Sequence, residues 1–307
     1  MKPLLAAAED YLVLRRALGF KLHHETWWLP DFVAYLASHG SATITTELAL
    51  RWAQQPADAD PSWWAKKLGA IRRFARHHHA CDPRTEVPPP DLLPYRAQRQ
   101  TPHIYSDEEL TSLFEQARRL PNPLTSATYT TILGLLTATG MRVGEALALD
   151  QQDVDWRQSF LTVRSSKFGK TRQLPLHHST TSALHDYVQV RDRLRPRRRT
   201  PSFFISRVGT RVIHQKFHHV FLRLIRLSGN DGGPGHRPRL HDLRHTFAVR
   251  TLRDWYRTGV DVEQRLPWLS TYLGHVNPIS TYWYLTATPE LLTLAADRLE
   301  HAWKVKS

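Results

Sequence analysis

Two short stretches near the C-terminal end combine cationic, imidazole and phenol side chains. The first is His241-Asp-Leu-Arg244-His245, and the second contains His275, which Tyr284 follows nine residues later. His241 and Arg244 lie three apart in a helical stretch, so their side chains project from one face. The arginine fork donates two parallel hydrogen bonds to phosphate and stays charged at any relevant pH. This set of side chains suits nucleophilic attack on a phosphodiester.

An earlier segment supplies a second arginine, in Arg142-Val-Gly-Glu145. Gly140 breaks the preceding helical pattern, and a new helix begins near Arg142, where backbone N–H groups add positive potential. Two arginines can clamp both non-bridging oxygens of one phosphate. Lys167 stands in the turn Lys167-Phe-Gly-Lys170 of a predicted hairpin. A lysine on such a hairpin can give a proton to the departing 5′ oxygen.

The tyrosine is the predicted nucleophile, and it needs help. Its unperturbed pKa is about 10, so attack at neutral pH requires a base or strong electrostatic support, which His241 or His275 can supply. Most catalysis in phosphoryl transfer is positioning and charge neutralisation, so we expect no metal and no nucleotide cofactor. A covalent link to tyrosine also conserves the energy of the phosphodiester, so the strand can be rejoined without ATP.

The residues singled out so far follow an order that resembles the motifs of the tyrosine recombinase family: Arg142-x-x-Glu145, Lys167 in a hairpin, His241-x-x-Arg244, His275 and Tyr284. That family includes phage integrases, chromosome-dimer resolvases and mobile-element transposases. The resemblance covers residues 105–300. It implies the following roles: Arg142 and Arg244 bind the scissile phosphate, His241 and His275 hydrogen-bond it and assist proton transfer, Lys167 is the general acid, Tyr284 is the nucleophile, and Glu145 supports them from behind.

The choice of tyrosine has competitors. Tyr272 and Tyr282 also lie near His275, and the nine-residue spacing and the position after Thr281 favour Tyr284. The stretch between the second arginine and the second histidine is longer than is usual in the family, which suggests a mobile-element branch.

The choice of lysine has a competitor as well. Lys170 competes with Lys167, which stands where the first hairpin lysine of the family falls. We expect Lys170 and Arg172, with their positive charges, to contact DNA.

The composition favours a polyanionic partner. The 307 residues include 42 Lys and Arg against 28 Asp and Glu, which gives a formal charge of +14 and a pI near 10.2. Nucleic acid is the leading candidate. Residues 1–95 are nearly neutral, with 11 basic against 10 acidic side chains. One predicted helix nevertheless carries five cations, which we expect to contact DNA phosphates: Lys66, Lys67, Arg72, Arg73 and Arg76. An ordinary solvated helix face is the alternative.

The first part of the chain reads as an all-α domain. Apolar residues at three- and four-residue spacing predict helices over 3–18, 27–38, 45–54 and 61–79, so residues 1–82 form a helical DNA-binding domain. The family resemblance implies a core-binding domain of the SAM-like type here. Prolines between 83 and 104 exclude a continued helix and predict a stiff linker between two domains.

Residues 105–307 read as a mainly α catalytic domain with a small antiparallel sheet. Ser106 and Glu109 form a capping-box pattern, a helix is expected over 124–138, and strands are expected over 159–166 and 171–176. A C-terminal helix carries an apolar stripe that suits docking into a neighbouring protomer: Leu292, Ala295, Ala296, Leu299 and Trp303. Packing within its own chain is the alternative. The resemblance implies a clamp around DNA and a homotetramer that exchanges strands through a Holliday junction.

We therefore predict a site-specific recombinase that cuts and rejoins double-stranded DNA through a covalent 3′-phosphotyrosyl intermediate, in integration, excision or transposition of a mobile element. Accessory recombination proteins are further expected partners. A type IB topoisomerase-like enzyme and a non-catalytic accessory DNA-binding protein are the alternatives, and the intact set of six catalytic-type residues disfavours the second. The lone Cys81 forms no internal disulfide, and no apolar run approaches the ~20 residues that span a bilayer. A cytoplasmic, nucleoid-associated protein without membrane contact is expected.

Overall fold

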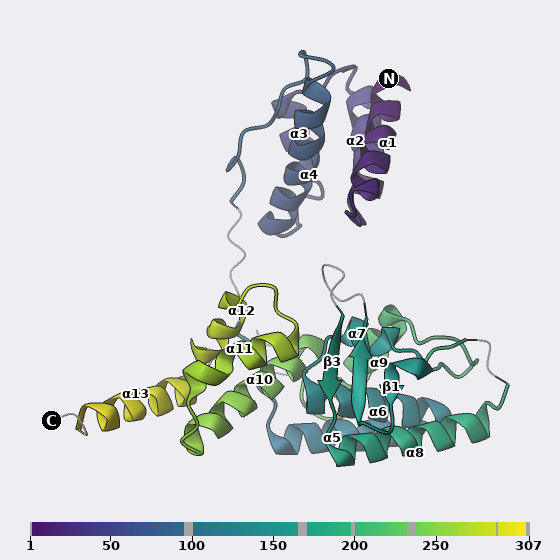
Figure 1. The fold of residues 1–307 in the computed structure, drawn as a ribbon. Coiled ribbons are helices and arrows are strands. Elements are labelled where there is room, and N and C mark those ends of the chain that lie inside the picture. The colour runs from purple at the N-terminus through teal and green to yellow at the C-terminus, as the bar shows by residue number, and fades with distance from the viewer. Residues whose placement is uncertain are drawn as a thin grey trace. The chain divides into compact units, whose positions relative to one another are not determined.

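The computed structural model describes residues 2–94, 101–164, 171–197, 200–231, 237–286 and 288–304. The chain divides into two compact units, Met1–Gln100 and Thr101–Ser307. Both are built mainly from helices, and the second also contains a three-stranded antiparallel sheet (Figure 1). The mainly α fold class predicted from the sequence is confirmed. None of the described helices is long and apolar enough to cross a lipid bilayer.

The first unit consists of the helices α1 (Lys2–Ala17), α2 (Glu25–Ser38), α3 (Thr46–Ala53) and α4 (Pro61–His79). Each bound falls within two residues of the predicted one. Local signals explain the starts: the Thr45 side chain accepts a hydrogen bond from the backbone of α3, and Asp60 does the same for α4, which has Pro61 at its first position. The helices enclose their own core around Phe32, Trp52 and Phe74.

The proline-rich segment differs from the expected linker, because its first half packs on the first unit. The Thr46 backbone N–H donates to a Glu86 carboxylate oxygen at 2.7 Å. Arg72 donates through Nε to the Pro88 carbonyl at 2.8 Å and through Nη2 to the Pro89 carbonyl at 2.6 Å. The carbonyls of a proline run have no helix or strand partner, so a nearby arginine can satisfy them.

The second unit begins with α5 (Asp107–Arg118), and its predicted capping box is present. Ser106 Oγ accepts from the Glu109 N–H at 3.1 Å, and the Glu109 carboxylate accepts from the Ser106 N–H at 2.8 Å. The next elements are α6 (Pro123–Thr139), α7 (Val143–Ala148) and a short 3₁₀ turn, η1 (Gln151–Asp153). After the sheet come α8 (His178–Leu194), which packs along α6, and α9 (His214–Leu227).

The sheet has the strand order β1-β2-β3, with β1 (Val154–Asp155), β2 (Phe160–Val163) and β3 (Arg172–Pro175). The two predicted strands are present but shorter than expected, and β1 is too short to leave an alternating pattern in the sequence. Val163 pairs with Arg172 on the last described rung. The connection that carries Lys167 and Lys170 lies outside the described residues.

The C-terminal part contains α10 (Leu240–Arg257), α11 (Val262–Leu273), α12 (Ile279–Tyr282), the 3₁₀ turn η3 (Trp283–Thr286) and α13 (Pro289–Lys304), around a core of their own. Leu291 of α13 is buried in this core and Leu294 packs against it. Of the predicted docking stripe, Leu292 is half exposed and Ala296 is exposed, whereas the side chains of Leu299 and Trp303 lie outside the description. The chain's own core therefore uses a face next to that stripe.

Candidate active site

A glycine turn at the end of α6 brings the first arginine into place. Gly140 takes the left-handed conformation, with φ of 59°, and its N–H donates to the Leu136 carbonyl. A Cβ atom added at Gly140 would lie 2.5 Å from a ring carbon of Phe247 on α10. Glycine is therefore required twice, by the backbone and by the neighbouring helix. The chain then turns so that Arg142 caps α7 in an extended conformation.

We expect Gly140→Ala to destabilise the second unit by roughly 2–5 kcal/mol, because the left-handed backbone and the Phe247 clash add. Gly259 offers a matched control, since it also has positive φ, of 72°, but no atom lies within 4 Å of the Cβ position. Gly259→Ala should cost only about 1 kcal/mol. Urea denaturation of the two variants measures the difference, and equal losses would contradict the packing argument.

Glu145 joins two arginines. Its carboxylate accepts from Arg142 Nη1 at 2.8 Å and from the Arg142 N–H at 2.9 Å, and from Arg172 at 3.1 and 2.9 Å. The Glu145 side chain is only 7% exposed. Burial alone raises the pKa of this carboxyl, but the hydrogen bonds from Arg172 and Arg142 outweigh burial and hold the pKa below its usual value. Glu145 is thus a charged partner at neutral pH.

Three consecutive carbonyls at the end of α11 receive one arginine each. Arg172 Nε donates to the Tyr272 carbonyl at 2.9 Å, Arg244 Nη2 to Leu273 at 2.7 Å, and Arg142 Nη2 to Gly274 at 3.0 Å. The last carbonyls of a helix have no partner within it, and they form the negative end of its dipole. The end of α11 therefore gathers cations from β3, α10 and the start of α7.

Arg244 is the most deeply placed of these arginines, with 2% of its surface exposed. It also donates through Nη1 to the Gly140 carbonyl at 2.8 Å, so it links the glycine turn to α11. Burial, with the nearby charges of Arg142 and Arg172 against that of Tyr284, lowers the pKa of Arg244 to about 10. The group stays protonated at neutral pH, as a phosphate ligand must.

Two imidazoles, those of His245 and His275, lie beside the phenol of Tyr284, and a third, that of His241, lies beside His245. The ring of His245 lies 4.7 Å from that of His241 and 5.5 Å from that of Tyr284. The His275 ring lies 6.1 Å from the Tyr284 ring and nearly parallel to it, at 20°. His275 Nδ1 is 2.6 Å from Thr281 Oγ1, a contact that fixes the orientation of the imidazole.

His241 stands on the exposed first turn of α10, one turn before His245. Desolvation by neighbouring protein atoms, with the charges of His245 and Arg244, lowers the pKa of its imidazole below the usual value. His241 is therefore neutral at pH 7, and the lowered pKa makes it a weaker base than a free imidazole.

The three candidate tyrosines differ in their surroundings. Tyr284 is 2% exposed, lies on η3 and has the imidazoles around it. Tyr282 is 53% exposed. Tyr272 stacks on Phe247, with ring centres 5.7 Å apart, and burial raises its pKa to about 12. Among the three, the geometry favours Tyr284 as the nucleophile.

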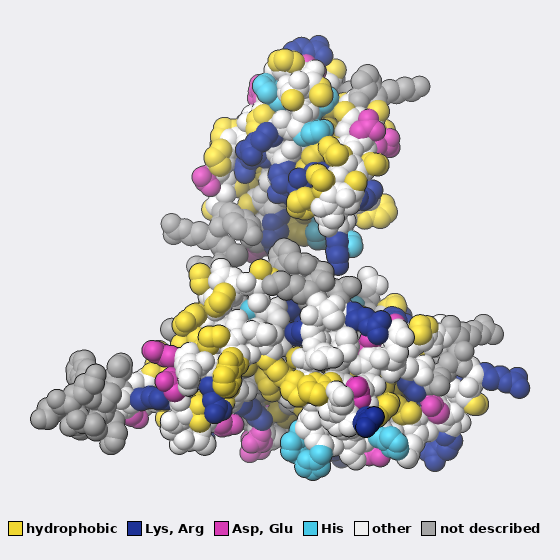
Figure 2. Space-filling model, viewed as in Figure 1, with side chains coloured by type: hydrophobic (Ala, Val, Ile, Leu, Met, Phe, Trp, Pro, Cys, Tyr) yellow, Lys and Arg dark blue, Asp and Glu magenta, His cyan; other side chains and the backbone are white. Residues whose placement is uncertain are grey.

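The cations expected on α4 to contact DNA fall into two groups. Lys66, Arg73 and Arg76 are exposed, and Arg73 pairs with Glu25 at 2.8 Å. Figure 2 shows Lys and Arg side chains on the visible face of the first unit, interspersed with hydrophobic ones. Arg72 is occupied by the proline carbonyls described above.

Lys67 is not exposed for DNA contact, in contrast to the prediction from the sequence. It is 7% exposed, and its ammonium donates to the carbonyls of Trp52 at 3.1 Å and Gln55 at 2.8 Å, at the end of α3. These carbonyls have no partner within α3, so Lys67 caps that helix and is not placed to meet a phosphate.

Arg172 also departs from its expected role as a DNA contact, because its side chain is 11% exposed and engaged by Glu145 and the Tyr272 carbonyl. Two further residues had no predicted role. Thr281 holds His275, and His245 touches the tyrosine ring. The sequence does contain a signal for His245, because a residue four positions after His241 on a helix lies on the same face.

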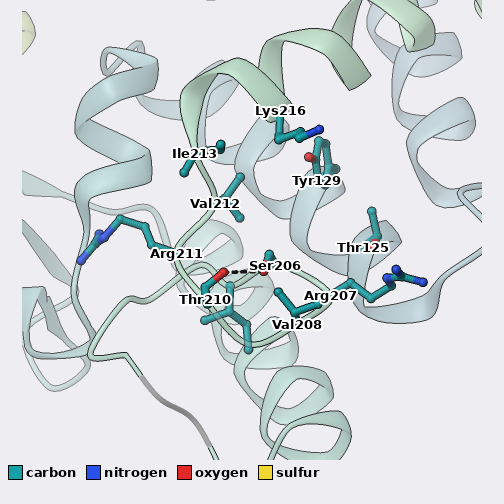
Figure 3. A pocket seen from close by; sticks show the side chains of 11 residues that line it. Thr125, Tyr129, Ser206, Arg207, Val208, Thr210, Arg211, Val212, Ile213 and Lys216 are labelled. Carbon is teal, nitrogen blue, oxygen red and sulfur yellow. Dashed lines mark hydrogen bonds between the residues drawn. The ribbon is translucent and has the colours of Figure 1, made fainter.

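A separate pocket of about 440 Å³ lies between the start of α6 and the segment before α9, lined by Tyr129, Val212 and Lys216 among others (Figure 3). None of the residues with expected catalytic roles lines it. Among the described residues, no group of three or more His, Cys, Asp or Glu side chains is placed to hold a metal ion.

The chain is similar to known proteins over most of its length. The model of the phage integrase family matches residues 105–290. The integrase/recombinase y4rB of Sinorhizobium fredii (strain NBRC 101917 / NGR234) is 45% identical over 305 residues, which cover 97% of each chain. A second relative from the same organism, integrase/recombinase y4rE, is 36% identical over 293 residues and 94% of each chain.

Among solved structures, the Tn1549 transposon integrase in complex with transposon right end DNA superposes with a TM-score of 0.67, at 15% identity, over 96% of this chain and 98% of that one. At this identity the likeness shows the fold. The matching family model and the close relatives over the whole chain show more: the protein belongs to the phage integrase family of tyrosine recombinases.

Proposed function

We propose that this integrase-family enzyme is a site-specific recombinase that cuts and rejoins DNA through a covalent 3′-phosphotyrosyl intermediate at Tyr284, and that it moves a mobile element by integration, excision or transposition. One observation carries the proposal. Arg142 and Arg244 are fixed by the end of α11, which leads directly into His275, and the rings of His275 and His245 lie beside that of Tyr284. The neighbour that is a transposon integrase in complex with transposon DNA supports the mobile-element assignment.

The arginines suit the binding of a phosphodiester. Each guanidinium has five N–H donors, and the carbonyls of Gly274, Leu273 and Gly140 together with Glu145 take only part of them. Fixed protein acceptors hold the guanidinium groups of Arg142 and Arg244. Their remaining N–H donors can therefore stabilise the negative charge that develops on the phosphate oxygens without rearranging.

The chemical step exchanges one ester for another. The Tyr284 oxygen forms a bond to phosphorus, its proton passes to the imidazole of His275 or His241, and the bond from phosphorus to the 5′ oxygen breaks. Lys167 gives the departing oxygen its proton. The product is a 3′-phosphotyrosine and a free 5′ hydroxyl, and the reverse attack by a 5′ hydroxyl restores the strand.

The partners follow from this reaction. The substrate is double-stranded DNA with a specific site, which the exposed Lys66, Arg73 and Arg76 of α4 help to hold through phosphates. The exposed Leu292 and Ala296 of α13 support docking between protomers in a tetramer on DNA. Work on chromosomal DNA would place the enzyme at the nucleoid, in the cytoplasm.

The direct test is an adduct assay in EDTA. The protein is incubated with nicked suicide duplexes taken from the DNA that flanks its own gene, and a denaturing gel with mass spectrometry locates the adduct. We expect an adduct at Tyr284. Tight binding without any adduct would instead identify an accessory protein, and relaxation of supercoiled DNA without a specific site would identify a topoisomerase.

Lys167→Ala should slow the cleavage of a normal phosphodiester by about 10²-fold or more, because the 5′ oxygen then leaves without a proton. A duplex with a 5′ sulfur at the scissile position leaves readily without one, so it should be cleaved at nearly the wild-type rate. Single-turnover gels on the two duplexes measure this, with Lys170→Ala in parallel. Equal losses on both duplexes would remove Lys167 from the acid role, and a selective loss in the Lys170 variant would transfer it.

A further inference from the structure

The guanidinium of Arg172 is bonded to the protein through each of its three nitrogen atoms. Nη1 and Nη2 donate to the two carboxylate oxygens of Glu145 at 3.1 and 2.9 Å, and Nε donates to the Tyr272 carbonyl at 2.9 Å. All three guanidinium nitrogens are thus engaged by the protein, in the planar fork geometry that arginine alone provides. The side chain is 11% exposed.

Glu145 links Arg172 to Arg142, because its carboxylate accepts hydrogen bonds from both. The same carboxylate accepts from Arg142 Nη1 and from the Arg142 backbone N–H, at 2.8 and 2.9 Å. Without Arg172, a nearly buried carboxylate would keep one cation in place of two, and its pKa would rise. The direction of the Arg142 guanidinium, which Glu145 holds, would then no longer be fixed from both sides.

The backbone beside His275 rests on the same guanidinium. A Cβ atom added at Gly274 would lie 2.8 Å from Arg172 Nη1, so the guanidinium lies directly against the backbone at the end of α11. Arg172 also holds the carbonyl of the adjacent Tyr272. The backbone that leads into His275 is therefore held in place by one side chain of β3, that of Arg172.

We infer that Arg172 is a positioning residue for strand cleavage. It orients Arg142 through Glu145, and it fixes the position of the end of α11, which His275 follows in the chain. The inference rests on the proposed function of the site. Arg172 belongs to β3 and pairs with Val163 of β2, so it ties the sheet to the phosphate-binding side chains. In this role it acts through Glu145 and the Tyr272 carbonyl.

The test compares Arg172→Ala and Arg172→Lys with a matched arginine. Arg211 also donates to a carboxylate, that of Asp150 at 2.6 Å, and to two carbonyls, those of Leu147 and Leu149, in the same unit. We expect both Arg172 variants to cleave a suicide duplex 10–100-fold more slowly at saturating protein, a range typical of residues behind a reactive centre. Lysine cannot span Glu145 and Tyr272 together, so it should rescue little. Arg211→Lys should cleave at the wild-type rate.

Two readouts separate positioning from other roles. The salt dependence of DNA affinity should be unchanged, whereas loss of a phosphate contact lowers the slope of log K against log salt by about 1. Glu145→Gln combined with Arg172→Ala should be no slower than the slower single variant, because both act along one path. Losses that multiply, or a reduced salt slope, would overturn the inference.

The two proposals fail in different ways. If the wild-type chain forms no adduct, the proposed function fails before Arg172 is tested. If the wild type forms it and both Arg172 variants do so at the same rate, only the positioning role is refuted. Circular dichroism and the thermal midpoint of each variant show whether a lost rate reflects unfolding, and Arg172→Lys serves where the alanine variant does not fold.

Discussion

We expect Tyr284→Phe to bind its DNA site as tightly as the wild type and to form no covalent adduct. The substitution removes one oxygen from a side chain that is 2% exposed, and it keeps the ring that packs beside His245 and His275. The fold is therefore retained while the nucleophile is lost. Gel shift measures binding, and a denaturing gel of the suicide duplex measures the adduct.

Tyr282→Phe is the matched control, because Tyr282 lies two residues away and is 53% exposed. It should form the adduct normally. The same should hold for Tyr272→Phe, which keeps the ring stacked on Phe247. An adduct that persists in Tyr284→Phe and disappears in one of these two variants would move the nucleophile to that residue.

The second large effect is expected for Arg244→Lys, which should lower the rate of strand cleavage on the order of 10³-fold or more. Arg244 bridges the Gly140 and Leu273 carbonyls, and a lysine cannot hold both and also present two donors to a phosphate. The loss of a fixed donor to developing charge costs on the order of 10²–10³ in rate, and the loss of an arginine on a transferring phosphoryl group costs more. Single-turnover cleavage at saturating protein isolates this effect from binding.

Stability needs its own control in this experiment. Arg191 is likewise 2% exposed, and it donates to the Phe203 carbonyl at 2.8 Å within the same unit. Arg191→Lys should lower the denaturation midpoint without slowing cleavage by the folded protein. If the two lysine variants lost stability equally and cleaved equally well, Arg244 would be a structural arginine only.

Much of the site was readable from the sequence because it depends on local spacing. The positions of His241 and Arg244 on one helix face follow from a separation of three. The placement of Arg142 at a helix start follows from Gly140, where the preceding helix must end. The Ser106 capping box is a pattern of four residues and was equally visible.

The predicted DNA contacts of Lys67 and Arg172 differ from the structure because each side chain donates to backbone carbonyls of a distant element. Lys67 flanks the apolar stripe of α4 as a solvated residue would, yet its ammonium donates to two carbonyls at the end of α3. Arg172 is 100 positions from the Tyr272 carbonyl that it contacts. Side-chain chemistry in a sequence shows which residues are charged. It does not show which backbone acceptors will face them, since these belong to distant elements.

The grouping of Arg142, Arg172 and Arg244 on the end of α11 has a consequence for the timing of the reaction. The mutual repulsion of three cations is overcome during folding, by Glu145 and by the helix dipole, before any substrate arrives. Little reorganisation of these side chains remains when DNA binds. For the proposed recombinase, binding free energy would then be left for bending the duplex or for joining protomers, and that assembly would decide when a strand is cut.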